Sequence, residues 1–441
     1  MPHPGGIFLR TSCVAGLLAV LSGCAGSPPP APASAPSPTP VTCSVSGMTA
    51  SSTPDPRWPN VASGTVSGPS LTLNPTRTIR AASDLTIVTQ NDLIIKGRIE
   101  LPARAPVGTN LVLVSLHGKI LIDSGAYIGG GSPVRGNGGT IMLSGQTVEI
   151  LGTVEGNGGG SGLNVNGDSA RGANGDIGGD VHVCAEDGIV VGALNAPAGA
   201  LALVRGGNGG RGGNGIATGS NDTTGIGGTG GKGGDVIFEV RPGAASAQVV
   251  VDVFADPQGG GGGLGGQAAA DSRDGRNGGS AVARGGIGGA GGTVRFTTAL
   301  VRNVGPNIRG GDGGNGGPAS AEGGDGDNAW ALAGSPGGAA RATGGSGGPP
   351  GPAPVIPLLG GDPQAGSPGS PGHGASAAAL AGSGGSAGTH WYKGGSTGMG
   401  TATGGPNGNG AAPPVVPPFG PVAATGPGGG TTTNVTAPGM P

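Results

Sequence analysis

Carboxylates are the side chains in this sequence best suited to acid–base chemistry. Asp123, Glu149 and Asp252 lie in or beside runs of alternating aliphatic residues, where a strand would hold them on one face of a sheet. Two carboxyl groups on one face can act as the general acid and the general base of glycosidic-bond hydrolysis. The sequence contains no Asp-Asp dipeptide, however, and no Ser/His/Asp or Cys/His set at a plausible spacing. We therefore expect no catalytic residues.

Two further motifs point to enzymes only weakly. The "GHG" at 372–374 resembles a polygalacturonase fragment, but it lies among Gly and Pro residues outside any strand pattern. Matches to GxGxxG say nothing about dinucleotide binding, because Gly fills 107 of the 441 positions and no helical pattern follows. Neither motif changes the expectation of a non-enzymatic protein.

Acidic residues in the Gly-rich turns are the remaining candidates for metal binding. Asp312, Asp325 and Asp327 resemble the Gly-Asp repeats that bind Ca²⁺, but the apolar strand residue that should follow each turn is missing. "NVNGDS" at 164–169 lacks the Gly and the distal Glu of an EF-hand loop. The cysteines have no His pair at a zinc-ligand spacing. We expect solvated turn residues, with no metal and no cofactor.

Composition excludes several classes of protein. The sequence has 107 Gly and 40 Pro residues, and aromatic residues make up only 2% of it. This composition provides too few large side chains for a conventional globular core. The net charge of −2 provides neither the basic face of a nucleic-acid-binding protein nor an acidic tail. We expect one thin, extended architecture and no nucleic-acid partner.

The first residues carry the most specific motif. Arg10 precedes the short apolar run "CVAGLLAVL" at 13–21, which is too short to span a bilayer and is typical of a signal peptide. Leu21-Ser22-Gly23-Cys24 resembles the lipobox of bacterial lipoproteins. The resemblance implies cleavage after residue 23, lipidation of Cys24, and an extracytoplasmic protein attached to a lipid membrane; Ala25 resembles the residue of lipoproteins sent to the outer membrane. An ordinary secretory signal with a chance Cys is the alternative.

The residues after Cys24 predict a stalk and a disulfide. Residues 24–42 include the Pro/Ala/Ser run "AGSPPPAPASAPSPTP", which is extended and semi-rigid in polyproline-like conformation. Cys43 and Cys184 then remain as an even pair in an oxidising compartment, where a disulfide is favoured over two free thiols. Such a bridge would close a loop of about 140 residues and contribute on the order of 5 kcal/mol in the chain-entropy model.

Alternating aliphatic residues predict strands over 43–305. The paired runs lie at 84–101, 110–128, 140–156, 180–196, 235–255 and 293–305. Four of them begin after the same punctuation, Gly-Gly followed by Thr140, Asp180, Asp235 or Thr293. No helical period separates the strands, so the pattern favours an all-β, right-handed parallel β-helix whose coils bury inward aliphatics by stacking. The expected inward residues are Leu85, Ile87, Leu111, Leu113, Ile141, Leu143, Val181, Val183, Val236, Phe238, Val294 and Phe296.

Gly-Gly-X triplets fill the loops between these runs. Examples lie at 206–215, 225–235, 285–293 and 310–318. A period of three predicts polyglycine II segments, whose bare glycine edges allow backbones to approach and bond between segments; a flexible linker is the alternative. The triplets resemble the glycine-rich regions of mycobacterial PGRS-type surface proteins and springtail polyglycine II antifreeze proteins, and the paired strands resemble β-helical adhesins. None of these resemblances transfers a functional residue.

We expect residues 306–441 to form a Gly/Pro-rich low-complexity region with a segment or two docked onto the coils. Trp391 and Tyr392 form its isolated aromatic pair, either a local anchor or a sugar-stacking platform. Taken together, the sequence predicts a non-enzymatic surface lipoprotein with a structural or adhesive role and a surface glycan or protein as ligand. The alternative is a carbohydrate-active β-helix enzyme, a lyase or hydrolase.

Overall fold

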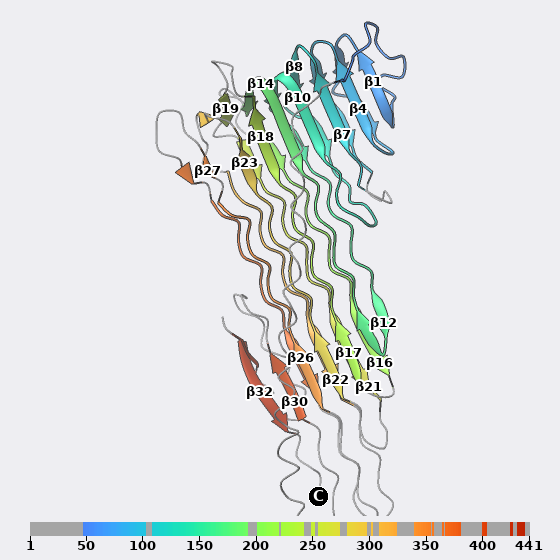
Figure 1. Ribbon diagram of the computed structural model, residues 1–441, viewed down its shortest axis with the longest axis vertical. Coiled ribbons are helices and arrows are strands. Elements are labelled where there is room, and N and C mark those ends of the chain that lie inside the picture. Colours follow the sequence, from blue (N-terminus) through green and yellow to red (C-terminus); the bar gives the residue numbers. More distant parts are fainter. Residues whose placement is uncertain are drawn as a thin grey trace, which may run out of the picture. The chain divides into compact units, whose positions relative to one another are not determined.

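The computed structural model describes a chain built from strands and extended segments (Figure 1). It describes residues 47–102, 108–192, 201–219, 222–241, 248–251, 255–273, 280–297, 301–302, 308–323, 339–353, 355–356, 364–365, 367–380, 399–403, 424–426 and 430–436. None of these residues is helical, and most of the strands pair in parallel. The chain divides into two compact units, Met1–Thr42 and Cys43–Pro441, and every described residue belongs to the second. The predicted all-β class is confirmed.

Row 1 is a ladder of parallel strands that carries most of the predicted strand starts. In order it contains β1 (Gly64–Gly68), β4 (Leu85–Thr89), β7 (Leu111–Ser115), the first half of β10 (Ile141–Ile150), the first half of β14 (Val181–Val191), β18 (Val236–Val240) and β23 (Val294–Phe296). The last four begin directly after the Thr or Asp of the predicted punctuation. The switch from triplets to alternation therefore marks the first residue of a row 1 strand.

Two more rows complete each passage of the chain. Row 2 contains β2 (Leu71–Leu73), β5 (Leu93–Ile95), β8 (Lys119–Ile122), the second halves of β10 and β14, β19 (Gln248–Val251) and β24 (Val301–Arg302). Row 3 contains β3 (Thr78–Arg80), β6 (Arg98–Glu100), β9 (Tyr127–Gly129), β11 (Thr153–Glu155), β15 (Ala202–Arg205) and β20 (Ala255–Gln258). The first six passages visit rows 1, 2 and 3 in this order, and their strands pair in parallel from passage to passage. The passage with β23 and β24 reaches row 3 only through a bridge between Arg309 and Gln258.

The aliphatic core lies between the three rows. Alternation along each strand sends every second side chain inward, so Leu85, Leu111, Ile141, Val181 and Val236 follow one another in register and are all buried. All the residues expected to point inward are buried except Phe296, which is partly buried. The Phe296 ring stacks on Phe238 with a centroid separation of 5.2 Å.

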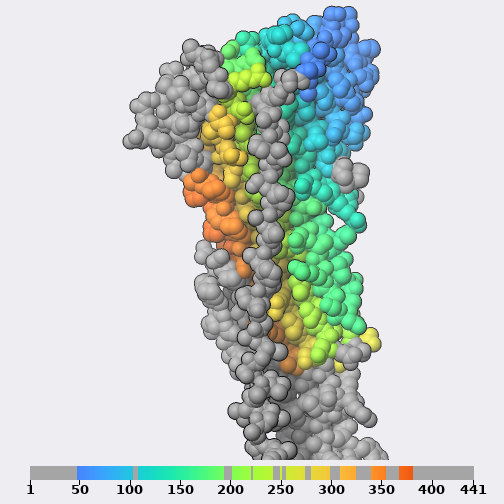
Figure 2. Space-filling model, viewed as in Figure 1, coloured from blue at the N-terminus to red at the C-terminus, as the bar shows by residue number. Residues whose placement is uncertain are grey.

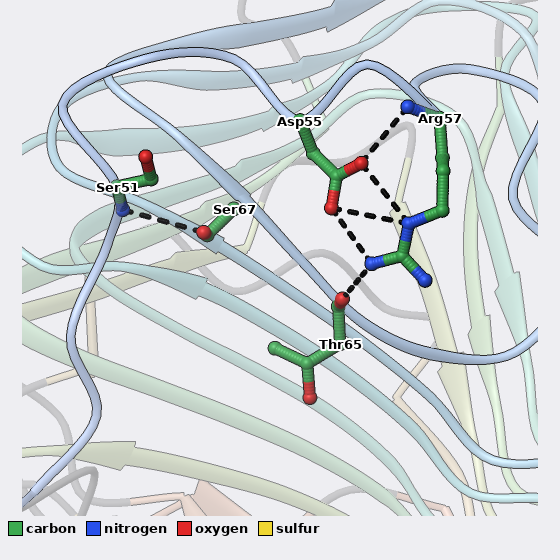
Figure 3. Close-up of polar contacts among 5 residues, drawn as sticks. All are labelled: Ser51, Asp55, Arg57, Thr65 and Ser67. Atoms are coloured by element: carbon green, nitrogen blue, oxygen red, sulfur yellow. Dashed lines mark hydrogen bonds and ion pairs between the residues drawn. The ribbon is translucent and has the colours of Figure 1, made fainter.

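Residues 47–63 cap the first passage (Figure 3). The edge of β1 would otherwise expose carbonyl groups, but Arg57 Nη2 donates to Thr65 O at 2.6 Å and the Asp55 amide donates to Ser67 O at 2.9 Å. Asp55 holds Arg57 through hydrogen bonds that lower the pKa of the carboxyl below its usual range. Trp58 packs against the core and donates its Nε1–H to Thr72 O at 3.2 Å. The first edge is therefore closed.

Two further parallel sheets have a core of alanine. The five-stranded sheet contains β12 (Val165–Gly167), β16 (Gly215–Gly219), β21 (Ala268–Ser272), β25 (Ala319–Glu322) and β29 (Ala377–Leu380). The seven-stranded sheet contains β13 (Ser169–Arg171), β17 (Thr223–Ile226), β22 (Ala281–Arg284), β26 (Ala340–Thr343), β30 (Met399–Thr403), and the antiparallel β32 (Gly430–Thr436) and β31 (Ala424–Gly426). Their inward residues, among them Ala217, Ala268, Ala283 and Ala342, form one buried cluster.

The alanine sheets were not expected from the sequence. Ala occupies many of the buried positions of their strands, and alanine is a weak strand former, so the predicted organisation placed these residues in glycine-rich loops. Several lie beyond residue 305, where a low-complexity region was expected, as do the short antiparallel strands β27 (Val355–Ile356) and β28 (Gln364–Ala365).

Candidate functional site

Gly-Gly-X segments connect the three rows to the alanine sheets (Figure 1). We call a segment outgoing when it leads from row 3 to the five-stranded sheet, and returning when it leads from the seven-stranded sheet back to row 1. The outgoing segments are 156–164, 206–214, 259–267, 310–318 and 368–376, and the returning ones are 172–180, 227–235 and 285–293; segment 344–353 leaves the seven-stranded sheet in the same way but leads to β27. In the space-filling view, successive segments lie side by side in order of colour (Figure 2).

The two glycines of each triplet have different hydrogen-bond partners. The first donates to the X carbonyl of the next segment of the same direction, as Gly209 does to Gly261 O at 2.8 Å. The second joins outgoing and returning segments, as Gly234 does by donating to Gly207 O at 2.7 Å. Gly260 then donates to Gly234 O at 2.8 Å, so these bonds run from pass to pass. The segments are consequently bonded to neighbours on two sides.

Asn and Asp at the X positions form side-chain ladders. Asn208 Oδ1 accepts the amide of Gly261 at 2.9 Å, and Asn214 Oδ1 accepts the amide of Gln267 at 3.0 Å. The same bond runs from the amides of Asn214, Thr229, Ile177, Ser370 and His373 to Asn164, Asn174, Asn137, Asp312 and Asn315, respectively. Each bond satisfies an X amide that the glycine backbone bonds leave unpaired.

A buried polar cluster lies where returning segments join row 1. Asp180 Oδ1 accepts the Asp235 amide at 2.7 Å, and both Asp235 oxygens lie 2.9 Å from Lys232 Nζ. Burial raises the pKa of Asp180 and lowers that of His182. His182 Nδ1 is buried without a hydrogen-bond partner among the described residues. Such shifts mark functional sites as well as structural networks, and the bonds here are those of the ladder.

A second polar cluster lies on the outer face of row 3. Arg98 Cζ lies 4.5 Å from the centroid of the Tyr127 ring, and its Nε donates to Glu100. Hydrogen bonding from Arg80 lowers the pKa of Glu100. Burial and the Glu155 carboxylate raise the pKa of Tyr127, whose hydroxyl lies 3.5 Å from that carboxylate. Gly129 separates Glu100 from Glu155 in register, so no side chain fills the position between them.

The structure places two of the three candidate carboxylates beside neighbouring strands of row 2. Asp123 follows β8 and lies 3.9 Å from Lys96, while Glu149 lies within β10 opposite Leu121 and Val190. Asp252 lies outside the described residues. Asp123 therefore lies two residues beyond the residue that Glu149 faces, with Lys96 as its ion-pair partner.

The other candidate residues take structural positions where they are described. Asp312 is a ladder residue, and the His373 of "GHG" lies in outgoing segment 368–376 with its amide bonded to Asn315. Asp325, Asp327, Trp391 and Tyr392 lie outside the described residues. Among the residues described, no group of three His, Cys, Asp or Glu could hold a metal ion.

The predicted lipid and disulfide residues are only partly within the described chain. Cys184 is buried on β14 and is disulfide-bonded. Cys24 and Cys43 lie outside the described residues, so lipidation and the Cys43–Cys184 pairing stay predictions. No helix among the residues described is long and apolar enough to cross a membrane.

Two hollows are bordered by described residues of the strands. One, of about 350 Å³, lies over β21, β25 and β29 and is lined by alanines together with Asp271, Glu322 and Leu380. Another holds about 20 Å³ beside Cys184 and Arg241. The larger hollow contains two carboxylates, Asp271 and Glu322, at paired positions of β21 and β25.

Known proteins give no relative. No family model, curated protein or solved structure matches this chain. The most regular feature of the described chain is the face formed by the outgoing segments. On four successive outgoing segments, one equivalent X position carries an exposed side chain; these residues are Arg211, Leu264, Asn315 and His373.

Proposed function

We propose that this chain is a non-enzymatic surface lipoprotein whose ectodomain is a rigid structural or adhesive scaffold of the cell envelope. The signal-like first residues and the Leu-Ser-Gly-Cys24 motif support attachment to a membrane through lipid. The Pro/Ala/Ser stalk to residue 42 would hold the ectodomain some 40–50 Å from the bilayer in extended form.

The finer fold belongs to the same proposal. Three rows visited in constant order, with parallel pairing between passes, support a parallel β-helix. Parallel crossover connections are right-handed in nearly all known folds, which supports the right hand. The hydrogen-bond period of three supports polyglycine II conformation in the Gly-Gly-X segments.

One observation carries the proposed function: the bonded segments present their X side chains in fixed rows. The glycine amides donate to carbonyl groups of neighbouring segments, and the X amides donate to the ladder side chains. The backbone of each segment is therefore held in place by hydrogen bonds. One such exposed row forms a surface of regularly spaced side chains rather than a cleft; it contains Arg211, Leu264, Asn315 and His373. A surface of this kind suits contact with an extended polymer such as a glycan, or with another protein.

The proposal is tested with the ectodomain from Cys43 onward on a glycan array and in pull-downs from envelope extracts. The triple variant R211A/L264A/H373A removes side chains from the outgoing row without removing a ladder acceptor. The matched control R284A/I287A changes two other exposed residues, one at the end of β22 and one in returning segment 285–293. Binding that is lost in the triple variant and kept in the control supports a binding row, whereas equal binding in both contradicts it.

Membrane attachment is tested separately. In cell fractionation, the Cys24→Ser variant of the full chain should move from the membrane to the soluble extracytoplasmic fraction. A variant protein that stays membrane-bound would overturn the lipid anchor while leaving the scaffold role to be judged by the binding experiment.

A carbohydrate-active enzyme is the second candidate, and Glu100 and Glu155 are the observation that favours it. The two carboxylates face outward from strands two apart in row 3, which places their Cα atoms about 9–10 Å apart. Inverting glycosidases hold their two carboxyl groups about 6.5–9.5 Å apart, a separation that side chains at these two backbone positions can reach. The lowered pKa of Glu100 opposes a proton-donor role. If polysaccharide cleavage is detected, E100Q and E155Q should abolish it, with D123N and E149Q as controls.

A further inference from the structure

The described strands of the two alanine sheets separate the charged residues by sign. In the five-stranded sheet the charged strand residues are Asp271 of β21 and Glu322 of β25, and both are exposed. In the seven-stranded sheet all of them are exposed arginines; these are Arg171 of β13, Arg284 of β22 and Arg341 of β26. None of these five side chains forms an ion pair with another described residue.

The acidic and the basic strand faces point in opposite directions. Ala270 of β21 and Ala283 of β22 belong to the one buried cluster in which the two sheets pack on each other. Asp271 follows Ala270 and Arg284 follows Ala283, so both charged side chains stand on outward positions. The alanine core therefore has an acidic face on one side and a basic face on the other.

The acidic face is hollowed where its carboxylates lie. The hollow of about 350 Å³ has small side chains in its lining, among them Ala269 and Ala378. Asp271 and Glu322 lie opposite one another on neighbouring strands, about 4.8 Å apart at the backbone. Arg273, which follows β21, forms no ion pair with either carboxylate. Like charges placed in this way repel each other, so the hollow favours an occupant with cationic groups.

The basic face combines its arginines with apolar side chains. Ile226 separates Arg171 from Arg284 in register, and Val282 lies opposite Arg341. Ile226 and Val282 are both partly exposed. Arginine is enriched at protein interfaces and can bind a carboxylate through two parallel hydrogen bonds. This face therefore offers both the cationic groups and the apolar bulk that the hollowed acidic face lacks.

We propose that the basic face of one copy of this chain docks on the acidic face of a second copy. The arginines bind Asp271 and Glu322, and the apolar side chains between them cover the hollow. Charge complementarity selects a second copy as the occupant, because each face finds its opposite on the far side of the same alanine core. Since the two faces differ, each bound copy keeps one free face, and further copies add side by side without closing a pair.

Sedimentation velocity of the full-length protein, purified in one non-ionic detergent for every variant, tests the proposal. The weight-average sedimentation coefficient of the wild type should rise with protein concentration. Raising the salt from about 0.1 M to about 1 M shortens the screening length from about 10 Å to about 3 Å, so the association should weaken roughly tenfold or more. This measurement needs no variant.

Charge reversal identifies the two faces. The variant D271K/E322K makes both faces basic, and the variant R171E/R284E/R341E makes both faces acidic, so each variant alone should remain monomeric. An equimolar mixture of the two offers basic faces to acidic ones and should associate again. All five positions are exposed, and thermal unfolding checks that both variants are folded.

The matched control D123K/E149K makes the same change of net charge in row 2 and should associate like the wild type. The proposal is wrong if the wild type stays monomeric at low salt, if the mixture of reversed variants does not associate, or if the control loses association equally. A monomeric wild type that binds polygalacturonate through the three arginines would assign the basic face to an acidic glycan instead. Because Arg284 lies on this face, glycan binding by R284A/I287A is compared at protein concentrations below the onset of association.

Discussion

The amide of Thr293 donates a 2.8 Å hydrogen bond to Oδ1 of Asp235, one pass earlier in the chain. The Asp235 amide donates in turn to Asp180, and earlier in the same column Thr140 donates to Asn110, which donates to Asp84. Each of these residues immediately precedes a row 1 strand. The residue that immediately precedes each row 1 strand therefore sets the register of one pass on the next.

Asp235 is the column residue with the most partners, and its removal should be costly. Asp235→Ala leaves the Thr293 amide and the Lys232 ammonium without their buried acceptor, so the free energy of unfolding should fall by about 1–3 kcal/mol. Asp235→Asn keeps an oxygen for Thr293 and should cost less. Denaturant unfolding measures both variants, and an alanine variant as stable as wild type would show that the column does not set the register.

The strand starts could be predicted because two periods meet there. Alternating aliphatics at Val236 or Ile141 are explained only by a strand with one buried face, and the preceding glycine pair fixes where it begins. The inward side chains followed from the same alternation. These features are local, so a single sequence contains them.

The alanine sheets, the ladders and the cap could not be predicted in the same way. Ala281 and Ala283 form a core only because the alanines of the other sheet pack opposite them. No local sequence pattern indicates that packing. The sequence indicates only solvent-facing polar residues at Asn208 and Asp312, because the amides that their side chains accept come from the next pass. Alternating Ala in "AVAR" and "ARAT" was the available signal for the sheets, and it is weak because alanine favours strands little.

Alanine substitution should distinguish the triplet positions. A Cβ on Gly263, a second position, would collide with Gly210 O, whereas a Cβ on Gly261, an X position, would meet only Asn208 Oδ1 at 3.2 Å. Gly263→Ala should therefore destabilise the protein by more than about 2 kcal/mol, by forcing two segments apart. Gly261→Ala should change stability by less than about 1 kcal/mol, because lost chain entropy in the unfolded state offsets the small adjustment. Calorimetry on the pair measures this contrast, and equal effects would contradict the inter-segment bonding.

The alanine core should reject larger side chains. Ala283 is fully buried between the two sheets, and its neighbour Val282 points outward and is partly exposed. Ala283→Leu must push the sheets apart or strain its rotamer, at a cost of about 1–3 kcal/mol. Val282→Leu changes volume on the outer face and serves as the control, with an expected effect within about 0.5 kcal/mol. If Ala283→Leu unfolded no earlier than the control, the alanine cluster would not be closely packed.

His182 should make the ectodomain less stable in mild acid. Burial is the main cause that lowers its pKa below the ordinary 6.5; Arg295 adds to the lowering, and the Asp235 carboxylate opposes it. The unfolded chain then binds a proton at higher pH than the folded chain, so the contribution of neutral His182 is fully present above pH 6.5. It is lost as the pH falls from 6.5 towards the folded pKa.

A methionine at position 182 isolates this effect, because it keeps bulk on the buried face and cannot titrate. Since His182 Nδ1 has no hydrogen-bond partner among the described residues, His182→Met should cost little at pH 7.5. Thermal unfolding between pH 7.5 and 5 should show a smaller loss of stability in the variant than in wild type. Asp180→Asn is the control, since the raised pKa of Asp180 makes acidification above pH 3.8 favour the folded state, which is the opposite sign. Parallel wild-type and His182→Met profiles would show that His182 is not the group being protonated.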